Sequence, residues 1–178
     1  MSESNDSFLV KQCLEGNLRA FEGLVDKYQK PIFNVAYRFL QNVQDAEDVT
    51  QAVFAKAFEK LQSFNTSLKF FSWIYKIAVN EALNFQDARK PNHELDENIA
   101  SHDKSPEGMY DVSEIEQQVT AALGKLKRDY QMVIILKHFQ DCKYEEMSQI
   151  LDIPVKTVKS RLFSARQQLK EILIRDVV

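Results

Sequence analysis

The sequence predicts an all-α protein made of two small helical domains joined by a flexible acidic linker. Apolar residues recur at three- and four-residue intervals along most of the 178-residue chain, which is typical of amphipathic helices. Glycine and proline number only 4 each, fewer than strands joined by tight turns normally require. The charge is also uneven, because one basic and eight acidic residues lie between 93 and 116. That segment has a net charge of −7, against 0 for residues 1–92 and +4 for 117–178, which together give the −3 of the whole chain.

The first part of the chain predicts two or three helices between residues 8 and 39. Apolar side chains recur there at helical spacing, and Gly16 with Asn17 interrupts the first helix. Pro31 suits either the first turn of a third helix or a kink between two helices.

The next predicted helix covers residues 44–61 and begins with a cluster of acidic residues. Asp45 is expected to cap it, with Glu47 and Asp48 in the first turn. Two interpretations of these carboxylates are open. Each stabilises a helix N-terminus by about 0.3–1 kcal/mol, or together they form a docking face for a basic partner. The residues alone favour the first interpretation.

The segment FFSWIYKIAVNEALNF, residues 70–85, predicts a helix with two faces. The inner face would bury Ile74, Ile77, Ala78 and Phe85. The opposite face would carry Trp73, Lys76, Asn80 and Asn84. An exposed aromatic ring beside a cation is suited to stacking on an unpaired base. The alternative is a Trp covered by a neighbouring helix beside solvated polar residues, and on these residues alone that alternative is favoured.

Residues from about Pro91 to Tyr110 combine two prolines and one glycine with strong negative charge, which predicts a flexible, solvated linker. We therefore expect a first domain at 1–91, a linker at 92–111 and a second domain at 112–178.

The strongest local pattern is a predicted helix-turn-helix between Tyr144 and Leu169. A short helix, the connection LDIP and a longer helix follow one another, and the longer helix has five basic and no acidic residues between 155 and 170. The second helix of such a motif lies in the major groove of DNA. The candidate DNA-contacting residues are its outward ones: Lys156, Thr157, Lys159, Ser160, Arg161, Ser164 and Arg166. The alternative is a merely solvated basic face.

Catalytic and metal-binding patterns are not found in the sequence. It has no glycine-rich phosphate loop, no nucleophile elbow and no zinc-binding pair of histidines on one helix. Cys13 and Cys142 are expected to be reduced thiols of a cytoplasmic protein. The polar N-terminus does not have the pattern of a signal peptide, and no apolar run approaches the ~20 residues that span a bilayer. We therefore expect no enzymatic activity, no cofactor, no metal and no small-molecule substrate.

Three segments together resemble the extracytoplasmic-function group of bacterial sigma factors. They are DAEDVTQAVFAKAFEKL at 45–61, FFSWIYKIAVNEALNF at 70–85 and YEEMSQILDIPVKTVKSRLFSARQQL at 144–169. The most specific parts are TVKSRLFSAR at 157–166 and WIYKIAVN at 73–80. The resemblance covers nearly the whole chain, and it implies a σ2 domain followed by a σ4 domain.

The resemblance also implies partners and residue roles. Core RNA polymerase would be bound through the clamp helices of its β′ subunit and through its β flap. The residues implied for core polymerase are Asp45, Glu47, Asp48, Gln51 and Phe54. The loop from Phe64 to Lys69 would capture a flipped base of the −10 promoter element, and the residues implied for −10 DNA are Phe64, Asn65, Lys69, Trp73, Lys76, Asn80 and Asn84. The −35 element would be bound by the outward residues of the last helix. Family members are commonly inhibited by an anti-sigma factor, which is often anchored in the membrane.

Two other functions are compatible with the pattern. A helix-turn-helix regulator acting without replacing a sigma factor would bind duplex DNA tightly by itself. An adaptor whose basic helix binds an acidic protein would give no DNA footprint in any mixture.

Overall fold

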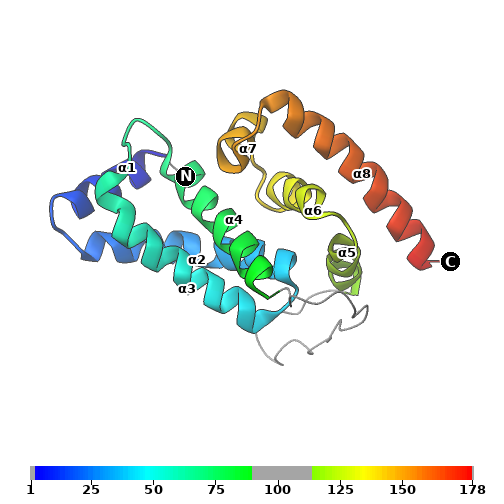
Figure 1. Cartoon of the computed structure of the whole chain (residues 1–178). Helices are drawn as coiled ribbons and strands as arrows, with labels where there is room; N and C mark the ends of the chain where they lie inside the picture. The colour runs from blue at the N-terminus through cyan, green and yellow to red at the C-terminus, as the bar shows by residue number, and fades with distance from the viewer. Residues whose placement is uncertain (1–2, 90–113, 178) are drawn as a thin grey trace.

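The computed structural model describes residues 3–89 and 114–177, and the regular elements in these ranges are all helical (Figure 1). The first half contains α1 (Glu3–Leu14), α2 (Arg19–Leu40), α3 (Val43–Lys60), the short 3₁₀ helix η1 (Leu61–Ser63) and α4 (Phe70–Ala88). The second half contains α5 (Glu114–Gly124), α6 (Arg128–Ile134), the π-helical turn η2 (Ile135–Phe139), α7 (Tyr144–Leu151) and α8 (Val155–Val177). These elements confirm the predicted all-α fold. The predicted linker, 92–111, lies outside the described residues.

Helices α2, α3 and α4 form the centre of the first half. Helix α2 buries Leu24, Tyr28, Ile32 and Val35, whose spacing places them on one face. Pro31 lies inside this helix, which runs unbroken from Arg19 to Leu40. It therefore neither starts a third helix nor ends the second.

The N-terminus of α3 differs from the prediction. Asn42, not Asp45, is the cap, because its Oδ1 accepts a hydrogen bond of 2.9 Å from the backbone N–H of Asp45. The carboxylate of Asp45 is buried and pairs with Arg89 beyond the end of α4. Asp45 thus links the start of α3 to the end of α4.

The second half is built around the buried run from Met132 to Leu136, which crosses from α6 into η2. Helices α7 and α8 pack onto this half through Met147 and Ile150 and through Val158, Leu162 and Ala165. The uninterrupted apolar run is buried on all sides, which is why it shows no amphipathic period.

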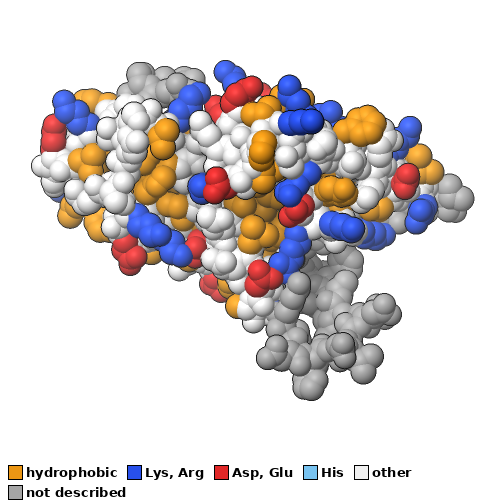
Figure 2. Space-filling view, turned by 45° about the horizontal axis from the view of Figure 1, so that its top comes forward, with side chains coloured by type: hydrophobic (Ala, Val, Ile, Leu, Met, Phe, Trp, Pro, Cys, Tyr) orange, Lys and Arg blue, Asp and Glu red, His pale blue; other side chains and the backbone are white. Residues whose placement is uncertain are grey.

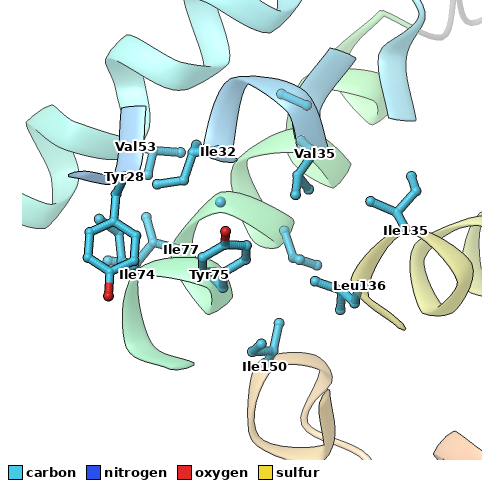
Figure 3. Close-up of a cluster of buried hydrophobic side chains, with 14 of the residues drawn as sticks. Tyr28, Ile32, Val35, Val53, Ile74, Tyr75, Ile77, Ile135, Leu136 and Ile150 are labelled. Carbon is cyan, nitrogen blue, oxygen red and sulfur yellow. The ribbon is translucent and has the colours of Figure 1, made fainter. Parts of the chain in front are cut away.

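One apolar cluster continues from the first half into the second. In Figure 3, Ile135 and Leu136 point toward Val35 and Tyr75, and Ile150 of α7 lies beneath Tyr75. The ring of Tyr75 is 2% exposed, and its hydroxyl donates a 2.6 Å hydrogen bond to Oε1 of Gln140. Burial raises the pKa of Tyr75 above its ordinary value, so the hydroxyl remains a donor at physiological pH. The two halves are therefore in direct contact along α4.

Polar groups fix the other end of this contact. The side-chain amide of Gln131, which is 3% exposed, donates hydrogen bonds of 3.1 Å to the carbonyls of Arg38 and Phe39. Carbonyls in the last turn of a helix have no partner within the helix, so Gln131 of α6 completes the C-terminus of α2. Gln41 donates to the carbonyl of Thr120 at 2.6 Å, and the guanidinium of Arg38 lies 3.9 Å from the ring centre of Phe139.

We predict that Gln131→Ala lowers the free energy of unfolding by about 1–3 kcal/mol, because it leaves two carbonyls at the contact without their amide donor. Urea unfolding measures the change. Gln118→Ala, at an exposed position of α5, is the control and should change stability by less than about 0.5 kcal/mol. Equal effects of the two substitutions would contradict the structural role of Gln131.

Candidate nucleic-acid interface

Helices α7 and α8 form the predicted helix-turn-helix. Asp152 ends α7 in the left-handed conformation, with φ of 55°, and its backbone N–H bonds to the carbonyl of Ser148. Aspartate tolerates this conformation better than most residues do. The hydroxyl of Ser148 donates a 2.6 Å hydrogen bond to the carbonyl of Ile153, which fixes the turn from which α8 departs.

The predicted DNA-contacting residues of α8 differ in exposure and in the contacts they make. Lys156, Lys159 and Ser160 are exposed on its outer surface, and the Lys159 ammonium lies 5.4 Å from the ring centre of Tyr144. Thr157 and Ser164 are half-buried at the side of the helix.

The two arginines among these residues contact neighbouring elements. Arg161 pairs with Asp129 of α6 at 3.0 Å, while Nε of Arg166 donates a 3.2 Å hydrogen bond to Nε2 of His138 in η2. The outer surface of α8 therefore has fewer cations available than the sequence count suggests.

Phe163 and Gln167 are exposed on the same outer line of α8 as Lys156 and Ser160, and sequence reasoning missed both. The signal was present, because these four positions are separated by four, three and four residues and so share one helical face.

Helix α4 carries the second candidate nucleic-acid surface. Trp73 is half-buried, with its ring centre 4.9 Å from that of Phe64 and 5.4 Å from that of Phe70. Asn80 and Asn84 continue from Trp73 and Lys76 along the same face, and both are exposed. Trp73 thus fits neither the fully exposed nor the fully covered interpretation, since one part of its ring packs on neighbours and another part faces solvent.

The inner face of α4 agrees with the prediction at Ile74, Ile77 and Ala78, which are all buried. Phe85 was expected to be buried as well, but it is half-buried. It lies close to the end of the helix, where the guanidinium of Arg89 covers its ring at 5.5 Å.

The loop before α4 is ordered by Asn65. Its side-chain oxygen accepts hydrogen bonds from the backbone N–H of Ser67 at 3.0 Å and from the Ser67 hydroxyl at 2.7 Å. Phe64 is only 8% exposed and supports Trp73 from beneath, whereas Asn65 is exposed. The structure thus places Phe64 in the interior and Asn65 at the surface of the loop.

The implied polymerase-docking residues of α3 also divide by exposure. Glu47, Asp48 and Gln51 are exposed on one side of the helix. Asp45 is buried against Arg89, and Phe54, 9% exposed, packs edge-to-face on Phe21 with ring centres 6.5 Å apart. The surface available to a partner is therefore formed by Glu47, Asp48 and Gln51.

Two lysines of the candidate −10 surface are paired with carboxylates of the second half. Lys69 lies 3.2 Å from Glu146 of α7, and Lys76 lies 3.5 Å from Asp152 in the turn before α8. Both pairs are partly solvated, and the Asp152 side chain is 86% exposed. In this arrangement the helix-turn-helix neutralises part of the α4 surface.

An apolar groove of about 630 Å³ lies along α8, on the side that carries Arg166. Its walls come from α5, the α6–η2 segment and α8, and they include Val119, Ile134, Phe139, Leu169, Leu173 and Ile174. Arg166, Lys170 and His138 also line it. The groove therefore suits an apolar segment that also carries acidic residues.

Side chains that could ligate a metal are scattered through the described residues. No cluster of three or more His, Cys, Asp or Glu side chains suitable for a metal occurs there. Cys13 and Cys142 are free and buried, and burial raises the pKa of Cys142 to about 12, which keeps its thiol protonated. Within residues 3–89 and 114–177, every helix is too short or too polar to span a membrane.

The chain is similar to known transcription proteins over nearly its full length. The Sigma-70 region 2 family model matches residues 24–90, and the Sigma-70 region 4 model matches residues 116–169. The ECF RNA polymerase sigma-E factor of Escherichia coli is 35% identical, with 95% of each chain covered. The ECF RNA polymerase sigma factor SigW of Bacillus subtilis is 33% identical, with 94% of this chain and 96% of the relative covered.

Two solved structures have the same fold. CnrH, in complex with the cytosolic domain of CnrY, superposes with a TM-score of 0.76 and 26% identity, covering 97% of this chain and 99% of CnrH. The sigma factor RpoE of Bartonella quintana, in complex with the anti-sigma factor NepR, gives a TM-score of 0.71 and 25% identity, covering 88% of this chain and 98% of RpoE.

We predict that the folded protein loses stability as the pH falls below about 6.5, in part through His138. Partial desolvation of the His138 ring, which stays exposed on one side, lowers its pKa below the ordinary value of 6.5, and repulsion from Arg166 and Lys137 reinforces the shift. Between pH 6.5 and the lower pKa of the folded state, the unfolded chain therefore binds more protons than the folded chain, so stability falls as the pH is lowered.

Thermal unfolding between pH 7.5 and 5 tests this effect. His138→Gln should lose less stability over that range than the wild type. His102→Gln, outside the described residues, controls for loss of an imidazole. The same pH dependence in the wild type and His138→Gln would contradict the prediction.

Proposed function

The chain belongs to the extracytoplasmic-function group of sigma-70 RNA polymerase sigma factors, and from this membership we propose how its two halves divide promoter recognition. The first half, residues 1–91, acts as the σ2 domain, binding core polymerase and opening the −10 element. The second half, residues 112–178, acts as the σ4 domain and binds the −35 element. The observation that carries this proposal is the presence of two chemically different candidate nucleic-acid surfaces in one chain.

The surface of α8 suits duplex DNA. Lys156 and Lys159 offer cations for phosphates, while Ser160 offers a hydroxyl for base edges. Because α8 follows a tight turn after α7, its N-terminal part can enter the major groove, as in other helix-turn-helix proteins. Thr157 and Ser164 border this surface, and Arg161 and Arg166 would reach DNA by exchanging their present partners for phosphates.

The surface of α4 suits an opened strand. The partly exposed ring of Trp73 offers a stacking platform, Lys69 and Lys76 offer cations, and Asn80 and Asn84 offer amides that can bond base edges. Stacking on an aromatic ring contributes about 1–3 kcal/mol per base, which offsets the few kcal/mol needed to unstack a base. Asn65 is proposed to contact a base flipped out of the −10 element, and its exposure in the loop above the buried Phe64 supports this role.

Two surfaces are proposed for core RNA polymerase. Glu47, Asp48 and Gln51 form an exposed acidic and amide face on α3, which suits the clamp helices of the β′ subunit. Asp45 and Phe54 act indirectly, by holding α3 against α4 and α2. The apolar groove beside α8 suits the β flap.

An anti-sigma factor is proposed as a further partner. CnrH and RpoE were solved in complexes with CnrY and NepR, and NepR is an anti-sigma factor. Such a partner could hold the protein at the inner face of the membrane, while this chain itself acts in the cytoplasm. In this proposal the protein catalyses no reaction. Its binding free energy offsets the cost of opening DNA.

The paired lysines suggest that core polymerase must displace two ion pairs between the halves before these lysines can bind DNA. As long as Glu146 and Asp152 contact Lys69 and Lys76, these cations are unavailable to DNA. Solvent-exposed ion pairs contribute only about 0–1 kcal/mol each, so a partner that binds both halves can displace them.

The central test is run-off transcription from the promoter upstream of the protein's own operon. The wild type with core polymerase should give a promoter-directed transcript, and Trp73→Ala should reduce it, because each lost stacking contact removes about 1–3 kcal/mol of opening free energy. Permanganate footprinting of the −10 region measures opening directly.

Two controls isolate the opening step. Trp73→Phe keeps an aromatic ring and should retain most activity. A template whose −10 region is already unpaired should restore transcription by Trp73→Ala, provided that the variant still binds core polymerase. If the wild type gives no promoter-directed transcript with active core, the proposed function is rejected. Tight promoter binding without core would instead favour a helix-turn-helix regulator.

We also predict that Asp152→Asn raises the affinity of the free protein for a single-stranded −10 oligonucleotide, by up to about fivefold at low salt, because Lys76 loses its carboxylate partner. Asparagine tolerates the left-handed conformation at this position, so the turn should persist. Fluorescence anisotropy measures the affinity. Asp141→Asn is a matched control, since Asp141 is also left-handed, with φ of 48°, and pairs with Lys137 in place of Lys76. An equal gain in both variants would indicate a general charge effect and contradict the prediction.

A further inference from the structure

A cavity of about 350 Å³ lies between the two halves, beside α4. Helices α1, α2 and α4 line it together with two residues of the second half. The lining residues are Asp6, Lys27, Tyr28, Pro31, Phe71, Tyr75, Gln140 and Glu146. Figure 2 shows one face of the molecule on which hydrophobic side chains likewise lie between acidic and basic ones. Cavities of this size at the boundary between two domains are common sites for small organic ligands.

Three aromatic rings form the apolar wall of this cavity. The ring centres of Phe71 and Tyr75 are 4.4 Å apart, and the ring centre of Tyr28 lies 6.5 Å from Phe71 and 6.4 Å from Tyr75. Tyr28 and Tyr75, both labelled in Figure 3, are at most 4% exposed, whereas Phe71 is half-buried. Phe71 is therefore the ring best able to contact a bound molecule, and a flat aromatic ring would stack on it.

The carboxylates of the cavity already have partners. Asp6 accepts hydrogen bonds from the Lys27 ammonium and, at 2.6 Å, from the Tyr28 hydroxyl. Glu146 accepts from Lys69 at 3.2 Å through Oε1 and from the backbone N–H of the residue preceding α7 at 2.8 Å through Oε2. A bound anion would be repelled by both carboxylates, and a bound cation would compete with lysines already in place. Because a buried charge is costly without a partner, the cavity favours an uncharged ligand.

The hydrogen-bonding groups that remain open in the cavity are donors. Gln140 accepts from the Tyr75 hydroxyl through Oε1, and no group within residues 3–89 and 114–177 accepts from its side-chain NH₂. The Lys27 ammonium donates to Asp6 and has further N–H groups at the cavity wall. A ligand that satisfies these donors must supply acceptors, such as carbonyl or hydroxyl oxygens on an aromatic ring.

We propose that this cavity binds a small, uncharged aromatic compound that carries carbonyl or hydroxyl oxygens, and that the bound compound holds the two halves together. Its ring lies on Phe71, and its oxygens accept hydrogen bonds from Gln140 and Lys27. Phe71 and Lys27 belong to the first half and Gln140 to the second, so the compound binds the closed arrangement and opposes its opening. This last step rests on the proposed function, in which core polymerase displaces ion pairs between the halves.

Three compounds of matched shape test the chemistry of the site. They are para-hydroxybenzamide, which is uncharged, para-hydroxybenzoate, an anion, and para-hydroxybenzylamine, a cation. Calorimetric titration of the full free chain should give a dissociation constant in the millimolar range or below for the amide, as ligands of this size reach. The two charged compounds should bind at least about tenfold more weakly.

Two variants locate the bound compound, and a third is their control. Gln140→Glu keeps the acceptor for Tyr75 but removes both N–H donors, so it should weaken binding of the amide about fivefold. Phe71→Leu removes the ring and should weaken binding about threefold. Gln149→Glu makes the same change of charge at an exposed position of α7 and should bind like the wild type. Thermal unfolding without ligand shows that each variant is folded.

Binding to core polymerase measures the effect on opening. At ten times its dissociation constant, para-hydroxybenzamide should weaken binding of the wild type to core by up to about tenfold. The same concentration should weaken binding of Gln140→Glu by only about threefold, because its site is less occupied.

Two sets of results would overturn the inference. Amide binding that is absent, no tighter than that of the charged compounds, or unchanged in both Gln140→Glu and Phe71→Leu rules out the site. Amide binding at the site without loss of core affinity rules out its role in holding the halves together. The calorimetric titration needs no polymerase, so its outcome is independent of whether wild-type run-off transcription supports the proposed function.

Discussion

The burial of α4 is the constraint on which the rest of the structure depends. This helix packs against α2 and α3 within its own half and against α7 of the other half. Ile74, Tyr75, Ala78 and Val79 are all at most 2% exposed, although they point in different directions around the helix. Only one narrow face remains for solvent, and that face carries Trp73, Lys76, Asn80 and Asn84. The candidate single-strand surface is therefore what three sets of packing contacts leave uncovered.

The contact between the halves combines a strong component with weak ones. Tyr75, Leu136 and Ile150 bury apolar surface, and Gln131 completes the end of α2, so this part resembles an ordinary protein interior. The pairs Lys69–Glu146 and Lys76–Asp152 lie near the surface and are screened by solvent and salt. The apolar and amide contacts set the stability of the closed arrangement, whereas the ion pairs determine which lysines of the candidate single-strand surface are neutralised in it.

Sequence periodicity was sufficient for most of the fold and for the position of both candidate surfaces. Local spacing predicted α3, α4, α7 and α8, because each has a regular inner face. It failed where a residue's role depends on a distant partner. Asp45 was expected to cap α3 but is buried against Arg89. Gln131 completes the C-terminus of α2, and the local sequence carries no signal for that role. Lys76 and Asp152 are 76 residues apart in numbering, so their pairing had no local signal.

The left-handed conformation of Asp152 means that one substitution at this position changes two properties of the protein. Aspartate and glycine codons differ by a single base, and glycine adopts a positive φ without strain. One point mutation would therefore relax the turn before α8 and at the same time release Lys76. Because the backbone strain of the turn and the neutralisation of Lys76 depend on the same position, a glycine that removes the strain would also change how readily the free protein binds an opened strand in the proposed function.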